Sequence, residues 1–138
     1  MANENIILTE LEPAVGFTCA DNTGIEKGTH LKLTDPMTVI ITSGAANMFA
    51  GIAAEEKVAN DGKTKIGVYM RGIFRGTAGG SITAGDIIQS ETGGTNEFLT
   101  AAASTDNAGG CGIALEDATD GQTFKYLLNV GIGGSIET

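Results

Sequence analysis

The chain has 138 residues, with 17 acidic and 8 basic side chains, a formal net charge of −9 and two cysteines. Long-range repulsion disfavours nucleic acid and anionic membrane surfaces as partners, and no apolar run approaches the ~20 residues of a membrane span. The length suits one domain, and 21 glycines with only 5% aromatic residues favour many turns around aliphatic strands.

The first predicted element is an extended N-terminal arm, residues 1–16. Its candidate partner-binding residues are apolar side chains set among polar and acidic ones: Ile6, Ile7, Leu8 and Leu11. Two interpretations stay open. The arm pairs with another protein, or it is an edge strand of the same domain.

Residues 17–138 are predicted to form a single β-domain that contains a sequence repeat, about 25–74 and 82–132. Gly51-Ile52-Ala53-x-Glu55 reappears as Gly112-Ile113-Ala114-x-Glu116, and the offset between matched blocks drifts between 57 and 61 residues. Such drift is typical of loops that vary while paired elements stay fixed. The repeated positions are turn signals and apolar residues, so the duplication copied a scaffold without a visible active site.

Turn signals and β-branched residues predict the remaining elements. We expect short strands within 16–34 and at 38–42, and longer strand runs at 63–74 and 122–132, each entered through an Asp-Gly turn. The other expected features are a turn or two of helix within 53–59, a flexible joint at 76–81, and loops at 92–96 and 101–110. The fold class is therefore mainly β, a compact barrel-like or sandwich-like body built from two related halves.

Catalytic chemistry is not expected. His30 is the lone histidine and could in principle activate Cys111 as a nucleophile, but no third orienting residue accompanies the cysteine. An enzyme would require the two side chains within hydrogen-bond reach. In a reducing compartment Cys19 and Cys111 are expected to be buried thiols.

Metal and cofactor sites are not expected either. One histidine and two distant cysteines cannot form a zinc site. Asn60-Asp61-Gly62 and Asp117-x-x-Asp120-Gly121 lack the alternating oxygen ligands of a calcium loop and fit turn chemistry better. The adjacent acidic pairs Glu55-Glu56 and Glu116-Asp117 would point to opposite faces of a strand, a poor geometry for paired acid and base catalysis.

Several segments resemble the capsid cement, or decoration, proteins of tailed bacteriophages. They are Leu11-Glu12-Pro13-Ala14-Val15, Glu26-Lys27-Gly28-Thr29-x-Leu31-Lys32-Leu33, Gly51-Ile52-Ala53-Ala54-x-x-Lys57 with Gly72-Ile73-Phe74, and Gly112-Ile113-Ala114-Leu115-Glu116-Asp117-Ala118. The resemblance covers nearly the whole chain, and its motifs are structural turns and strands.

The resemblance implies a virion protein without catalytic activity. Such proteins bind the outside of the expanded head, usually as trimers, and hold neighbouring capsomers together. It implies the major capsid protein as partner, a homotrimer on the capsid, and a location on the capsid exterior after synthesis in the host cytoplasm. On this basis we expect residues 3–12 to become ordered on binding by adding a strand to a capsid or subunit edge.

The alternative interpretation is a free-standing β-barrel binding module, adhesin-like or fibre-associated, that recognises a host surface. Exposed aromatic residues around one loop cluster would favour it. A copy number near that of the main shell protein would favour the cement interpretation.

Overall fold

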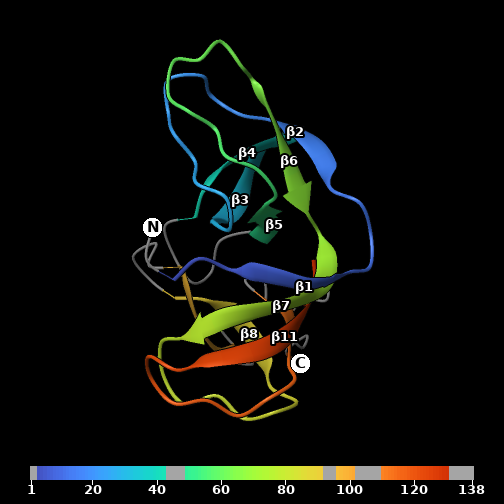
Figure 1. The fold of residues 1–138 in the computed structure, drawn as a ribbon, viewed down its shortest axis with the longest axis vertical. Coiled ribbons are helices and arrows are strands. Elements are labelled where there is room, and N and C mark those ends of the chain that lie inside the picture. Colours follow the sequence, from blue (N-terminus) through green and yellow to red (C-terminus); the bar gives the residue numbers. More distant parts are fainter. Residues whose placement is uncertain (1–2, 43–48, 92–95, 102–109, 131–138) are drawn as a thin grey trace, which may run out of the picture.

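The computed structural model describes residues 3–42, 49–91, 96–101 and 110–130. Within them the fold is all-β, with eleven strands and no helix. Accordingly, this part of the chain has no helix with the length and hydrophobicity needed to cross a membrane. Figure 1 shows two bodies stacked along the long axis, with the strands of residues 15–69 above and the strands from residue 71 onward, together with the N-terminal strand, below. This confirms the predicted β-fold of two related halves.

The upper body, barrel 1, is a closed five-stranded barrel. Its strands, in spatial order, are β2 (Val15–Thr18), β4 (Thr38–Ile41), β3 (His30–Asp35), β5 (Phe49–Ala53) and β6 (Lys65–Tyr69). β2 runs parallel to β4, and the other neighbours are antiparallel. Alternation along β6 turns Ile66 and Val68 inward, where they join an aliphatic core with Leu31 and Val39.

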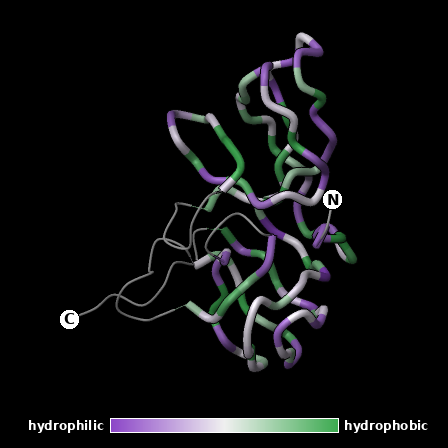
Figure 2. The backbone as a smooth tube through the Cα atoms, turned by 90° about the vertical axis from the view of Figure 1, so that its left-hand side faces the viewer, coloured by the Kyte–Doolittle hydropathy of each residue, from purple (hydrophilic) through white to green (hydrophobic). Residues whose placement is uncertain are grey.

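The lower body, barrel 2, is also closed by five strands. Their spatial order is β7 (Arg71–Ala78), β11 (Thr123–Asn129), β10 (Gly110–Ala114), β8 (Ile87–Ser90) and β9 (Glu97–Thr100), and a parallel β7–β9 pairing closes the ring. Its core is aromatic, because Phe98, Phe124 and Tyr126 are fully buried and contact one another. Figure 2 shows apolar and hydrophilic segments alternating along the backbone of both bodies.

The N-terminal segment forms β1 (Ile6–Glu10), an edge strand that pairs antiparallel with residues 72–75 of β7. β9 pairs with the same β7 further along, at Thr77 and Ala78. Of the two interpretations of the arm, the structure thus shows the edge strand. Because β1 is already paired, the expectation that residues 3–12 become ordered only on binding is wrong. The division into an arm and one domain stays a prediction.

The two barrels repeat each other pairing by pairing. β2, β3, β4, β5 and β6 correspond to β7, β8, β9, β10 and β11, down to the parallel closing pair. Gly28 and Gly85 lie at equivalent turns with φ of 86° and 96°, a conformation that favours glycine. A Cβ at the equivalent Gly51 or Gly112 would collide with a backbone carbonyl of the neighbouring strand. The repeated glycines therefore maintain turns and close strand contacts.

The barrels contact each other through different faces. Phe49 and Ile52 lie on β5 of barrel 1, but their side chains pack in the core of barrel 2. The His30 ring lies against Phe98, with 4.3 Å between ring centroids, and Tyr69 meets Phe74 edge-on at 5.8 Å. No barrel 2 residue belongs to the core cluster of barrel 1 among the described residues. The contact is therefore asymmetric although the barrels are related.

Two local predictions were wrong. Residues 53–59 contain no helix, because Ala53 ends β5 and Lys57 makes an isolated bridge to Ile25. Residues 76–78 belong to β7, where Gly76 and Ala78 are buried, so only 79–81 remain outside a strand. Glycine at 76 permits close packing, since a Cβ there would meet Asn5 and Tyr126. The loops predicted at 92–96 and 101–110 lie mostly outside the described residues.

Candidate functional site

The predicted partner-binding residues lie on and just after β1. Ile6, Leu8 and Leu11 are 54%, 43% and 41% exposed, whereas Ile7 packs against the core of barrel 2. The register places Ile7 opposite Phe74 and skips Leu8, which forms a β-bulge. The structure thus separates the four residues into one anchor and three outward-facing aliphatic side chains.

Asn5 fastens β1 to both barrels, and sequence reasoning missed it. Its backbone N–H and its Nδ2 both donate to the Gly28 carbonyl in barrel 1, at 3.2 and 2.9 Å. Its Oδ1 accepts a 2.8 Å hydrogen bond from the Tyr126 hydroxyl in barrel 2. Asn5 is 3% exposed. No sequence signal identifies it, because an asparagine among polar residues is typical of a surface loop.

The acidic pair of the first half is structural. Glu55 Oε2 accepts a 2.7 Å hydrogen bond from the Gly67 N–H on β6, and Glu56 Oε1 accepts a 3.3 Å hydrogen bond from the Lys27 N–H. Each carboxylate therefore satisfies a backbone donor on a different segment. The pair lies after the end of β5 and not in a strand, so the alternation of faces expected for a strand does not apply to it.

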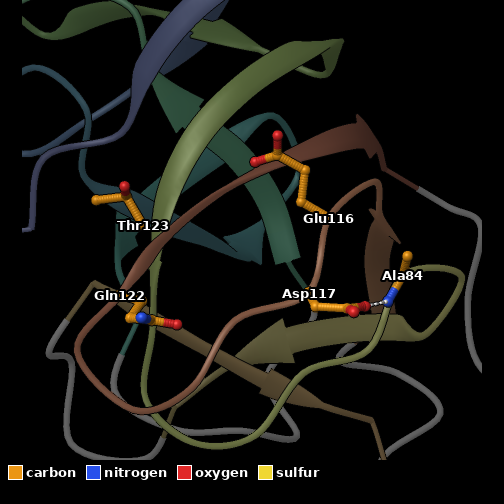
Figure 3. Close-up of a pocket in the computed structure, with 5 residues that line it drawn as sticks. All are labelled: Ala84, Glu116, Asp117, Gln122 and Thr123. Atoms are coloured by element: carbon orange, nitrogen blue, oxygen red, sulfur yellow. Dashed lines mark hydrogen bonds between the residues drawn. The ribbon is translucent and has the colours of Figure 1, made fainter.

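The second acidic pair repeats this arrangement and borders an open surface depression of about 740 Å³ (Figure 3). Glu116 Oε1 accepts from the Lys125 N–H at 3.0 Å, and Asp117 Oδ1 accepts from the Ala84 N–H at 2.8 Å. Gln122 and Thr123 complete the lining. No group of three potential metal ligands occurs in the described part of the chain.

Lys57 is a buried cation in barrel 1 that has no counterpart in the second repeat. Its Nζ donates to the Asp61 carboxylate and the Val58 carbonyl at 2.7 Å, and to the carboxylate and carbonyl oxygens of Asp21 at 3.0 Å. Burial lowers the pKa of Lys57, but hydrogen bonds to the two aspartates outweigh it and raise the pKa above its ordinary value. The Lys57 hydrogen bond lowers the pKa of Asp61 to about 2. Barrel 2 has Ala118 in this position.

His30 and Cys111 do not form a catalytic pair. His30 is fully buried between the barrels, where its backbone N–H donates to Asn96 Oδ1 at 3.1 Å and its ring Nδ1 lies 2.9 Å from Ser90 Oγ. The Cys111 thiol donates to the Ile88 carbonyl. Burial lowers the pKa of His30 to about 3 and raises that of Cys111.

The two cysteines are free thiols in separate cores. Cys19 belongs to the core cluster of barrel 1 and Cys111 to that of barrel 2. Burial also raises the pKa of Cys19. Both therefore pack as small hydrophobic residues, as the sequence predicted.

Comparisons with known proteins agree with a structural role for these features. Residues 12–130 match the model of the family described as phage cement protein. The chain is similar in structure to the N base of the head fibre gp8.5 of bacteriophage phi29, with 17% identity, a TM-score of 0.57, and coverage of 90% of this chain and 98% of that one. No curated protein matches the sequence.

Proposed function

Because the chain belongs to the phage cement protein family, we propose that it binds the outer surface of the expanded phage capsid and cements neighbouring capsomers. Family membership supports a structural role in the virion. The partner in this proposal is the major capsid protein, and the bound form is a homotrimer on the capsid exterior. The net charge of −9 favours this side of the shell, away from packaged DNA.

The observation that carries the proposal is the outer face of β1. Ile6 and Leu8 are exposed on a strand that β7 and Asn5 already hold in place, and Leu11 follows. β1 is the terminal strand of its sheet. Its far edge can accept a strand from the shell while its aliphatic side chains are buried. Since β1 is ordered beforehand, binding avoids much of the entropy cost of ordering a free arm.

Cementing follows from mass action. Each bound copy stabilises the shell by RT ln(1 + [L]/Kd), where [L] is the free concentration of the cement protein. A trimer that touches several capsomers raises the effective concentration of its second and third contacts. A protein without catalytic groups can stabilise a shell in this way.

The first test changes only the outward residues of β1. The double variant Ile6→Ser/Leu8→Ser should bind expanded heads at least about tenfold more weakly, because each lost aliphatic contact removes about 1.5–3 kcal/mol of burial. Co-sedimentation with heads that lack the protein measures the affinity. The matched control is Val58→Ser/Leu115→Ser, whose parent residues are 61% and 45% exposed outside β1. Equal binding by both variants would refute the β1 assignment.

Point variants are a sharper test than a deletion of residues 3–12, because the deletion would also remove Asn5 and Ile7 and expose the core of barrel 2. A thermal melt of the double variant should resemble that of the unmodified protein, since both substituted side chains are largely exposed.

A second measurement distinguishes the cement function from that of a free-standing binding module. Quantitative mass spectrometry of purified particles gives the copy number relative to the main shell protein. A ratio near one supports the cement function. A handful of copies would favour a free-standing binding module that recognises a host surface.

A further inference from the structure

Where the two barrels meet, a row of side chains on barrel 1 packs against a receiving face on barrel 2. The row crosses three strands of barrel 1, because Ile52 pairs with His30 on one side and with Tyr69 on the other. In barrel 2 three positions receive it, and they are 1%, 2% and 2% exposed: Phe74, Ser90 and Asn96. This inner contact is held by the hydrogen bond from the His30 backbone N–H to Asn96, by the hydrogen bond between His30 Nδ1 and Ser90 Oγ, and by the Tyr69–Phe74 ring contact.

The repeat places a second row on barrel 2. By strand register, its members are Ile87, Ile113 and Leu127, since Ile113 pairs with both of the others. Each is partly exposed, neither fully buried nor fully open to solvent, and none belongs to either core cluster. Barrel 2 thus carries an aliphatic copy of the row that barrel 1 uses.

The repeat also places a second receiving face on barrel 1. Val15 and Leu33 occupy the positions of Phe74 and Ser90, judged from their partners across the strands. Met37 occupies the position of Asn96, and both have the left-handed backbone, with φ of 51° and 61°. The three barrel 1 residues, Val15, Leu33 and Met37, are 40%, 41% and 53% exposed.

The two uncovered faces match each other chemically. In the inner contact the polar ring of His30 meets the polar Ser90, and the polar Asn96 accepts a hydrogen bond from the His30 backbone N–H. In the uncovered faces an aliphatic residue, Ile87, corresponds to the histidine, and Leu33 and Met37 correspond to its partners. Both uncovered faces thus have apolar residues at the positions where the inner contact has polar ones, and none of their six positions carries a charge.

We propose that these faces bind each other between copies: the row Ile87, Ile113 and Leu127 of one chain docks on Val15, Leu33 and Met37 of the next. Such a contact is heterologous, so it forms a ring if the rotation closes. The contact between two chains thus has the same arrangement as the contact between the two barrels of one chain. Because each chain contributes two barrels, the ring holds twice as many barrels as chains. The outer face of β1 is not part of this contact, so the contact between chains does not depend on capsid binding.

Crosslinking in solution tests the proposal. Leu33→Cys and Ile87→Cys proteins are mixed, concentrated together and treated with a short bis-maleimide. The mixture should give a crosslinked dimer of one chain of each kind, identified by mass, while each variant alone gives at least about tenfold less. Cys19 and Cys111 are 2% and 0% exposed, so the unmodified protein should give none. Equal crosslinking of either variant with itself would overturn the proposal, because it would show an isologous contact.

Sedimentation velocity provides the second measurement. The unmodified protein should self-associate as its concentration rises, and Leu33→Asp or Ile87→Asp should each shift this association at least about tenfold to higher concentration. The matched control is Val58→Asp, which places the same charge outside both faces and should associate normally. A monomer at every concentration, or equal loss in the control, would overturn the contact. Neither result would affect the capsid-binding test of β1.

Discussion

His30 shows at the scale of one residue how burial changes the role of a reactive side chain. The sequence marks it as a lone histidine and leaves a catalytic role open. In the fold it lies between two barrels, hydrogen-bonded to Ser90 and Asn96, with its ring tilted against that of Phe98. Burial lowers its pKa to about 3, so the ring is neutral at physiological pH. It therefore joins the barrels and makes their stability dependent on pH.

This dependence can be measured. Between pH 6.5, the ordinary pKa, and about 3, the unfolded chain binds a proton that folded His30 does not. Its contribution is thus present above pH 6.5, falls by about 1.4 kcal/mol per pH unit within the window, and levels off below it. His30→Asn keeps a polar atom near the Nδ1 position without titrating. Urea unfolding at pH 7, 6, 5 and 4 should show a shallower loss for this variant; parallel profiles would contradict the expectation.

At the scale of elements, the repeated Gly-Ile-Ala motif marks β5 and β10. Gly51 and Gly112 are required because the next strand approaches too closely for a side chain: a Cβ would meet the carbonyl of Tyr69 or Leu127. Gly51 also has a φ of 149°. The sequence predicted that these positions correspond, but the close strand contact that explains them required the structure.

Gly51→Ala and Gly112→Ala should each lower the free energy of unfolding by about 1–3 kcal/mol, since the added methyl overpacks a backbone contact. Gly16→Ala is the matched control, because nothing lies within 4 Å of a Cβ there. Chemical denaturation of the three variants measures the difference. Similar stability for Gly112→Ala and Gly16→Ala would show that β10 and β11 are less tightly packed than described.

At the scale of the whole molecule, the barrels are coupled by a shared core. Phe49 belongs to barrel 1 by sequence and pairing, yet it packs with Phe98 in the core of barrel 2. Asn5 hydrogen-bonds to both bodies. The core of barrel 2 is incomplete without Phe49 and Ile52 of barrel 1, and these two side chains would lose their packing without barrel 2, so we expect the barrels to unfold together.

Scanning calorimetry should accordingly show one transition whose calorimetric and van't Hoff enthalpies agree. Phe49→Ala should lower that transition without splitting it, at a cost of about 3–5 kcal/mol. Phe17→Ala, in the core of barrel 1, should act in the same way. Two resolved transitions in the unmodified protein would show that the barrels are independent domains.

The sequence by itself determined the β-class, the two related halves and the family, because turn glycines, Asp-Gly pairs and strand alternation are local signals. It also marked the apolar residues of the N-terminal segment as candidates for binding a partner, which stays a prediction. Only the tertiary structure decided where β1 pairs, how each barrel closes and which faces the barrels share. These depend on contacts between distant positions, such as Asn5 and Tyr126, which lie 121 residues apart. Such contacts leave no periodic pattern in the chain, because the fold alone brings their residues together.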